Sequence, residues 1–202
     1  NCLGANTTGG YNVAIGDGCM QANTTASANV AMGQAALYSN TTGESNVALG
    51  YAAMMLNTTT NQNIAIGREA LYNNVATNNI GIGYYALKAN TTGIENVAVG
   101  VQSLQLNTTA SYNTAVGKTA LYANTTGAQN TALGRTALYS NTTANDNTAV
   151  GYNAMYSNTT GAQNTAVGKD ALDANTTAHD NTAVGVGALG AMNGGGGKNI
   201  AV

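Results

Sequence analysis

Hydrophobic and polar residues follow one another along this chain in a pattern that repeats every 17 residues. Each copy opens with the pentad Asn-x-Ala-aliphatic-Gly, and a second apolar pair, mostly Ala-Leu, follows three and four residues after the Gly. A period this regular indicates one supersecondary unit stacked on itself many times. All steps are of 17 residues except one of 16 and a last one of 18. The opening asparagines are Asn12, Asn29, Asn46, Asn63, Asn79, Asn96, Asn113, Asn130, Asn147, Asn164, Asn181 and Asn199.

Each copy, numbered from the pentad Asn as position 1, predicts two short strands and two corners. Positions 1–4 carry β-branched residues that favour extended structure, and the Gly at position 5 allows a corner there. A second strand is expected at positions 8–11, and the Asn-Thr-Thr-Gly segment at positions 12–15 has the residues of a turn. We therefore predict an all-β parallel β-solenoid with about twelve coils, ~17 residues per coil and two short strands per coil.

The spacing of the large aliphatic residues predicts a flattened cross-section. They recur at positions 4 and 9 only, whereas a three-sided coil would need one about every six residues. A two-sided roll fits this spacing better. With successive coils ~4.8 Å apart, about twelve coils make a rod of roughly 55–60 Å.

Strand positions 3 and 4 are both apolar in nearly every copy, which predicts self-association. Adjacent residues of a strand point to opposite faces of the sheet, so both faces are apolar, as in a strand covered on both sides. One face can fill the interior of the roll, and the other would be covered most simply by another copy of the chain. The alternative is that Ala is small enough to tolerate water.

Composition excludes two classes of protein. Only 7% of the residues are charged, the formal net charge is -2, and six Lys and Arg residues cannot form the basic stripe of a nucleic-acid-binding protein. No apolar run approaches the ~18 residues of a membrane span. The 202 residues are expected to form one continuous solenoid over 1–202, with an irregular Gly-rich coil at 190–198. Because both ends fall inside a repeat, we expect the chain to be an excerpt of a longer polypeptide.

The pentads resemble a known kind of repeat. Those at Asn12–Gly16, Asn96–Gly100 and Asn113–Gly117 are similar to the head repeats of YadA-like trimeric autotransporter adhesins and to repeats of phage and bacterial tail-fibre-like proteins. The resemblance covers nearly the whole chain. It implies a left-handed parallel β-roll, three chains side by side as a homotrimer, and exposure on a cell or virion surface. It does not separate an adhesin from a tail fibre.

Ten Asn-Thr-Thr triplets match the acceptor pattern for N-glycosylation. Glycans on successive coils would crowd one another, so we interpret the triplets as structural: amides stacked in register can hydrogen-bond from coil to coil. The pentad asparagines are expected to form a second such ladder. The triplets begin at Asn6, Asn23, Asn40, Asn57, Asn90, Asn107, Asn124, Asn141, Asn158 and Asn175.

Two columns suggest ligand binding instead. Regularly spaced Thr pairs on a β surface could bind ice, although Thr also suits turns and strand edges. A Tyr column at position 10 could stack on sugar rings of a glycan, or else cover neighbouring coils or a subunit seam. The tyrosines of this column are Tyr38, Tyr72, Tyr122, Tyr139 and Tyr156.

Cys2 and Cys19 both occupy position 8, on neighbouring coils. Their expected separation lies within the range that a disulfide accepts, and an extracellular location would allow one to form. The other interpretation is two packed thiols, with Cys acting as a larger Ala.

Catalysis has little support in the sequence. His179 is the only histidine, the acidic residues form no recurrent pair, and no position supplies the Asp of a calcium-binding roll in every repeat. The run Gly194–Gly197 lacks the strand-loop-helix setting of a phosphate loop. We expect no enzymatic activity, no metal site and no cofactor.

The sequence as a whole predicts a structural protein of an extracellular fibre, an adhesin head or tail-fibre shaft, that mediates surface attachment. Its partners would be further copies of itself, end to end as well as side by side, and a host surface or glycan receptor. The alternative is a solenoid that recognises ice or glycans through its Thr, Asn and Tyr columns. Low complexity also allows intrinsic disorder, but the strict aliphatic columns argue against it.

Overall fold

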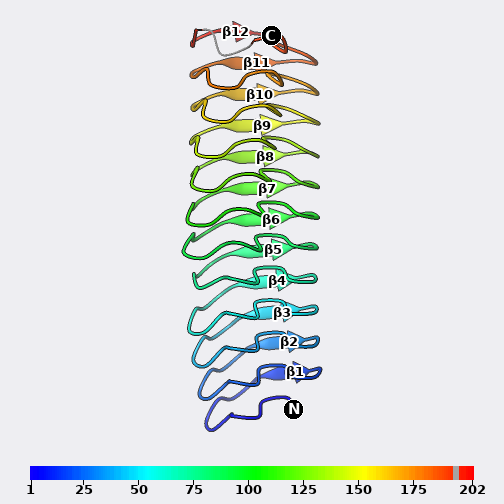
Figure 1. Cartoon of the computed structure of the whole chain (residues 1–202), viewed down its shortest axis with the longest axis vertical. Coiled ribbons are helices and arrows are strands. Elements are labelled where there is room, and N and C mark those ends of the chain that lie inside the picture. The colour runs from blue at the N-terminus through cyan, green and yellow to red at the C-terminus, as the bar shows by residue number, and fades with distance from the viewer. Residues whose placement is uncertain (193–195) are drawn as a thin grey trace.

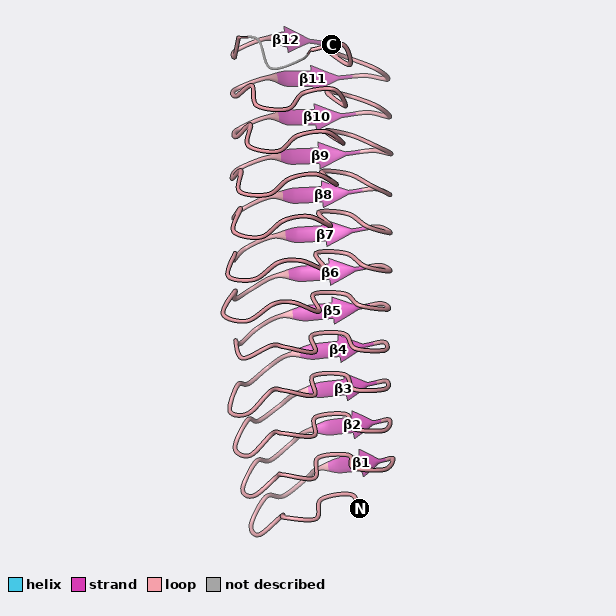
Figure 2. Cartoon of the chain, in the orientation of Figure 1, coloured by secondary structure: helices cyan, strands magenta, loops and turns pink. Residues whose placement is uncertain are grey.

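The computed structural model describes residues 1–192 and 196–202, and these form a single stack of similar coils from one end of the rod to the other (Figure 1). Twelve strands form one sheet in sequence order, and the described residues contain no helix (Figure 2). The strands are β1 (Val13–Ile15), β2 (Val30–Met32), β3 (Val47–Leu49), β4 (Ile64–Ile66), β5 (Ile80–Ile82), β6 (Val97–Val99), β7 (Thr114–Val116), β8 (Thr131–Leu133), β9 (Thr148–Val150), β10 (Thr165–Val167), β11 (Thr182–Val184) and β12 (Ile200–Ala201).

Every strand pairs with the next one in parallel and in the register of the pentads. Val97 pairs with Thr114, for example, and the 16-residue step keeps the register because Ile64 pairs with Ile80. The all-β parallel solenoid of ~17 residues per turn is therefore confirmed. About eleven turns separate β1 from β12.

The interior is thin and consists of stacked Ala, Leu and Met side chains. The residues at positions 3 and 8 of each coil, mostly Ala, face inward and are fully buried in most coils; the exceptions in type are Gly81 at position 3 and Cys2, Cys19 and Ser103 at position 8. Burying one Leu side chain stabilises the fold by about 1.5–3 kcal/mol. Because each coil adds one such side chain to the column, the stabilisation grows with the number of coils. The ten fully buried side chains of position 9 are Met20, Leu37, Met54, Leu71, Leu87, Leu104, Leu121, Leu138, Met155 and Leu172.

The second strand predicted for each coil is wrong, since these residues lie in turns. In the coil that follows β7, Thr119 and Leu121 have φ angles of 54° and 51°, in the left-handed region. Left-handed residues at alternate positions break an extended strand, but the hydrogen bonds between coils continue. Leu121 N–H donates to Ala137 O at 3.0 Å and Ala123 N–H to Tyr139 O at 3.0 Å. Each coil thus has one strand, and its other side is a hydrogen-bonded stack of turns.

The predicted corner at position 5 needs glycine for two reasons. The eleven glycines from Gly16 to Gly185 have φ between 126° and 141°, a conformation that strains any residue with a Cβ. The corners also stack closely, so that a Cβ on Gly117 would lie 2.6 Å from the carbonyl carbon of Gly134. Backbone conformation and close packing both explain why this Gly is invariant.

The expected irregular coil at 190–198 falls partly outside the described residues. In the part that is described, Met192 N–H donates to Leu189 O and Lys198 N–H donates to His179 O. After it, β12 resumes the parallel pairing, with Ile200 opposite Thr182.

Candidate functional site

The pentad asparagines form a continuous ladder through the interior. The side-chain Oδ1 of each accepts the backbone N–H of the pentad Asn in the next coil, at 2.9 Å from Asn46 to Asn29 and 3.0 Å from Asn63 to Asn46. The same contact recurs at every step from Asn12 to Asn199. Asn is required because a buried backbone N–H needs an acceptor, and no apolar side chain supplies one.

The Asn-Thr-Thr asparagines form a second column at position 12. Asn107 Nδ2 donates to Asn90 Oδ1 at 2.9 Å, and Asn124 Nδ2 donates to Asn107 Oδ1 at 2.9 Å. This column has two interruptions. The Oδ1 of Asn23 is buried without a partner, and that of Asn57 accepts the Thr60 hydroxyl instead of an amide.

Asn74 belongs to the second column, although it was not predicted there. Val75 replaces the first Thr of its triplet, yet Asn74 Oδ1 accepts from Asn90 Nδ2 at 2.7 Å and its own Nδ2 donates to Ala76 O at 2.7 Å. The signal in the sequence was its distance of eleven residues from Asn63, which is the same as in the other coils.

In most coils the two asparagine columns meet at one backbone carbonyl; the coil opened by Asn63 differs, because Asn63 Nδ2 donates to Asn61 O while Asn74 Nδ2 donates to Ala76 O. Gly127 O, at position 15, accepts from Asn113 Nδ2 at 2.9 Å and from Asn124 Nδ2 at 2.8 Å. Asn113 opens this coil and Gly127 lies near its end, so the contact closes the coil on itself. We call this group, formed by positions 1, 12 and 15, the asparagine clasp.

The clasp makes the triplets poor glycosylation sites in the folded protein. Both protons of the Asn124 amide are engaged, one by Asn107 Oδ1 and one by Gly127 O, and the side chain is fully buried. The geometry therefore favours a structural role for these residues.

The two threonines of each triplet differ in environment. Thr125 Oγ1 donates to Thr142 O at 3.0 Å, and Thr142 Oγ1 donates to Thr159 O at 3.1 Å. The second residues, such as Thr126 and Thr143, are exposed. Only one of the paired columns thus presents its hydroxyls to solvent, which weakens the interpretation of the Thr pairs as an ice-binding surface.

Neighbouring coils are joined in pairs at position 16. Ala128 N–H donates to Asn145 Oδ1 at 2.7 Å, and Ala162 N–H donates to His179 Nδ1 at 2.9 Å. Position 15 also differs between the two coils of a pair, with Gly127 in the first coil and Ala144 in the second. A Cβ on Gly127 would collide with the carbonyl of Ala144. The structural unit is thus two coils of 17 residues, interrupted once by the 16-residue coil opened by Asn63, in which no described residue makes such a bond. The other pairs are Gly10 with Ser27, Glu44 with Asn61 and Ile94 with Ser111.

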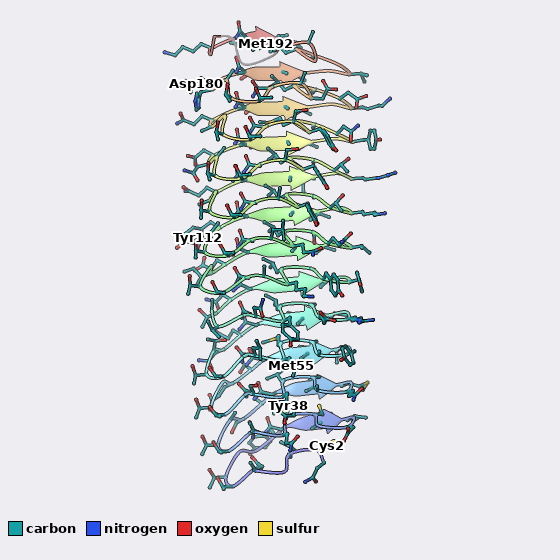
Figure 3. The ribbon with its side chains drawn as sticks, in the orientation of Figure 1. Cys2, Tyr38, Met55, Tyr112, Asp180 and Met192 are labelled. Atoms are coloured by element: carbon teal, nitrogen blue, oxygen red, sulfur yellow. The ribbon has the colours of Figure 1, made fainter. Side chains whose placement is uncertain are left out.

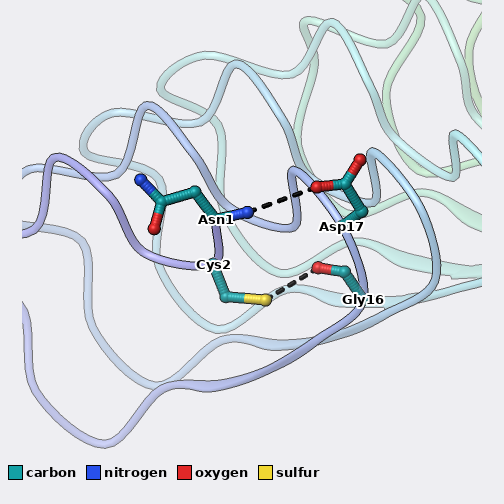
Figure 4. Close-up of polar contacts among 4 residues, drawn as sticks. All are labelled: Asn1, Cys2, Gly16 and Asp17. Carbon is teal, nitrogen blue, oxygen red and sulfur yellow. Dashed lines mark hydrogen bonds and ion pairs between the residues drawn. The ribbon is translucent and has the colours of Figure 1, made fainter.

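Cys2 and Cys19 are both free thiols, so the disulfide considered from the sequence does not form. Their sulfurs donate to different carbonyls, Cys2 Sγ to Gly16 O at 2.7 Å (Figure 4) and Cys19 Sγ to Ala31 O at 3.2 Å. Burial raises the pKa of Cys19 to about 11.

The structure brings together three of the five tyrosines of position 10. The rings of Tyr122, Tyr139 and Tyr156 stack with centroids 5.2 Å apart and planes within 9° of parallel. Burial, and then its two Tyr neighbours, raise the pKa of Tyr139. Since stacked rings cover one another's faces, little of the face of the middle ring is open to a sugar, and the stacking favours the interpretation that these rings cover neighbouring coils.

Tyr38 and Tyr72 do not join this stack because other residue types stand between them at position 10. Met55 follows Tyr38 on the next coil (Figure 3), and Lys88 follows Tyr72. Figure 3 also shows Tyr112 and Asp180, both at position 17, at the left edge of the rod.

A cluster that the sequence analysis missed lies on the coils of β3, β4 and β5. Glu69 has a side chain only 12% exposed, which Lys88 Nζ contacts at 2.6 Å and Arg68 Nε at 3.2 Å. The hydrogen bond from Lys88, helped by that from Arg68 against partial burial, lowers the pKa of Glu69. The available signal was a carboxylate and an Arg in a chain with few charges, next to coils with Tyr at position 6.

The outer face of the sheet carries two further columns, at positions 2 and 4. The Ala between them points inward, so the flanking aliphatic residues point outward. Val13, Ile15 and Met32 are 45%, 53% and 46% exposed. From β7 to β11 position 2 is Thr, and in β12 it is Ile200, whereas position 4 stays aliphatic to β11. The aliphatic column of position 4 is therefore a surface feature and not part of the core.

The described residues contain neither a membrane-spanning helix nor a cluster of metal-binding side chains. Across 1–192 and 196–202, no helix is long and apolar enough to cross a membrane. Within the same ranges, His, Cys, Asp and Glu side chains form no group of three that could hold a metal ion.

No protein-family model matches the chain, and neither does any curated protein or any solved structure with which it was compared.

Proposed function

We propose that this chain is a structural rod of an extracellular fibre, the head of an adhesin or the shaft of a tail fibre, that mediates surface attachment. In this proposal it is a left-handed β-roll that associates side by side as a homotrimer and also joins end to end. The role is mechanical and does not involve catalysis. The resemblance of its pentads to trimeric adhesin heads supports the handedness, the trimer and the surface location.

One observation carries the proposal: the outer sheet face has an apolar column along the rod at position 4, and position 2 is apolar as far as β6 and carries Thr, with its methyl group, from β7 to β11. Two outward columns about 7 Å apart, over eleven steps of ~4.8 Å, give a strip of about 500 Å² with its margins. A strip of that size is as large as the largest apolar patch of a typical monomer, and such patches often mark interaction sites. Two copies joined through it would bury about 1,000 Å², the lower bound of a specific interface.

The interior supports a mechanical role. Each coil is fixed to its neighbours by parallel backbone bonds and by the asparagine clasp, so stability accumulates along the axis as in other stacked repeats. A rod of this kind holds its shape with little core, which suits a spacer that carries a binding surface away from its base.

The test is to place charges on the outer face. The double substitution Val47→Lys and Leu49→Lys puts two ammonium groups in the strip without touching the buried Ala48. We expect the assembly to dissociate into folded monomers. The matched control is Thr109→Lys, on an exposed corner, which should leave the assembly intact. If the double variant keeps the mass of the parent protein, the outer face is not the interface.

A further inference from the structure

We propose that the cluster around Arg68 is a binding site for the carboxylate of an acidic saccharide, such as a uronic acid unit of a surface polysaccharide. This inference rests on the proposed function, because a fibre that attaches to surfaces needs a receptor contact. It assigns that contact to coils β3 to β5 and not to the predicted tyrosine column.

The site is built on a column in which the guanidinium group of an Arg lies between the aromatic rings of two Tyr residues. Tyr51, Arg68 and Tyr84 occupy position 6 of three successive coils, and the Arg68 guanidinium lies over the Tyr51 ring, 5.3 Å from its centroid. Tyr51 and Tyr84 are 49% and 40% exposed. The column therefore presents two partly open aromatic rings with a cation between them.

A second layer holds this column in place. Tyr85 stacks on Tyr84 with centroids 3.8 Å apart, and Lys88 Nζ lies 4.0 Å from the Tyr85 centroid. Lys88 and Arg68 both contact Glu69, whose carboxylate is nearly buried. Because Glu69 fixes the Nε side of the guanidinium, the side chain of Arg68 is oriented before any ligand arrives, which reduces the entropy lost on binding.

The hydrogen-bond donors of Arg68 that Glu69 does not engage indicate the chemistry of the ligand. Glu69 engages only Nε, and within the described residues the two Nη groups have no hydrogen-bond partner. A guanidinium with free Nη groups matches a carboxylate in a two-point contact. The apolar C–H face of a pyranose ring packs on exposed aromatic rings such as those of Tyr51 and Tyr84. A sugar that carries a carboxylate satisfies both features at once.

Charge agrees with an anionic ligand. Arg68 and Lys88 against Glu69 leave one net positive charge on the cluster, in a chain whose formal net charge is -2. The chain also offers a comparison site: Arg135, after β8, lies over the ring of Tyr152, after β9, at 5.8 Å from its centroid. That pair has Thr136 where the cluster has Glu69, and no Tyr85 or Lys88 equivalent. It provides the same cation and ring without the supporting layer.

The experiment measures binding of the full chain to polygalacturonate, with the methyl-esterified polymer as the neutral version of the same sugar. We expect the parent protein to bind the acid form and to lose affinity for the ester. Arg68→Ala should weaken binding by about tenfold or more, the usual effect of losing a charge-assisted pair. Arg68→Lys should recover only part of it, because an ammonium lacks the planar fork.

Arg135→Ala is the matched control and should bind as the parent protein does. Mass in solution, measured on each variant, reports assembly separately from binding. The proposal is overturned if the parent protein does not bind polygalacturonate, if it binds the ester equally well, or if Arg68→Ala and Arg135→Ala have the same affinity. Each of these results, obtained with an intact assembly, would reject the site and leave the fibre proposal standing.

Discussion

Asn130 donates its backbone N–H to the side-chain Oδ1 of Asn113 at 2.9 Å, and the same bond repeats at every turn of the rod. Asn113 also donates its own amide to Gly127 O at 2.9 Å. One side chain thus joins its coil to the next and closes its own coil. This double contact is what makes the first pentad position invariant.

Replacing Asn113 should therefore destabilise the protein strongly. Asn113→Ala leaves the buried N–H of Asn130 without an acceptor and removes one of the two donors to Gly127 O. Each unmet buried group costs about 1–3 kcal/mol, so we expect the free energy of unfolding to fall by about 2 kcal/mol or more in a urea titration. Thr126→Ala, on the exposed side of the same coil, should change it by less than about 0.5 kcal/mol. Equal effects of the two substitutions would contradict the clasp.

The alternation of Gly and Ala at position 15 predicts an asymmetric pair of substitutions. Gly127→Ala places a Cβ against Ala144 O and 2.6 Å from Asn124 Oδ1, and overpacking of this kind costs about 1–3 kcal/mol. Ala144→Gly creates no contact and should cost about 0.5–1 kcal/mol through chain entropy. Thermal unfolding of the two variants checks the order. If Gly127→Ala were the milder change, the coils would not be paired as described.

Hydrogen exchange should reveal the two-coil unit directly. The position-16 amides of Gly10, Glu44, Ile94, Ala128 and Ala162 donate to a side chain of the next coil and should exchange slowly. The position-16 amides of the second coils should exchange fast, because no acceptor faces them in the described residues. The position-17 amides of Gln129 and Asp146, bonded in both kinds of coil, serve as the uniform reference. If the position-16 amides of the first and second coils exchanged at the same rate, the pairing of coils would be refuted.

The two cysteines should differ in reactivity. Because burial raises the pKa of Cys19 from its ordinary value of 9.0 to about 11, the folded protein binds this proton more tightly than the unfolded chain. Its contribution to stability is therefore complete below about pH 9 and declines as the pH rises toward 11. Thiol alkylation at pH 8, followed by mass spectrometry, should label the exposed Cys2 and spare Cys19. Alkylation of Cys19 at the rate of Cys2 would show that its coil is open.

Much of the fold could be predicted from the sequence, because the constraints repeat in every coil. The invariant Gly at position 5 identified the corner, and the 17-residue period identified the register in which the strands pair. Twelve copies of a weak local preference amount to a strong one, since each coil must fit its neighbours.

The second side of each coil could not be predicted, because it depends on an uncommon backbone. Left-handed φ at residues such as Leu121 is rare outside Gly, Asn and Asp, and Ala-Leu pairs read as strand or helix equally well. The orientation of position 4 was uncertain for a related reason. Alternation alone says that positions 3 and 4 face opposite ways, but not which one faces inward.

Only part of the candidate site could be predicted from the sequence. The asparagine columns follow from periodicity alone, as every member shares one position. The Arg68 cluster occurs once, so no repetition signals it, and it depends on which side chains stack across coils. Tyr38 and Tyr72 show the opposite error: sharing a column did not bring them together, because Met55 and Lys88 interrupt it.

The most direct test of the account is the mass of the protein in solution, measured by light scattering after size-exclusion chromatography. If the apolar outer face joins three copies, the mass should be three times the 20.2 kDa of one chain, or a multiple of that value where rods join end to end. A stable, folded species of 20.2 kDa at micromolar concentration would show that the outer face tolerates water and would contradict the proposed fibre.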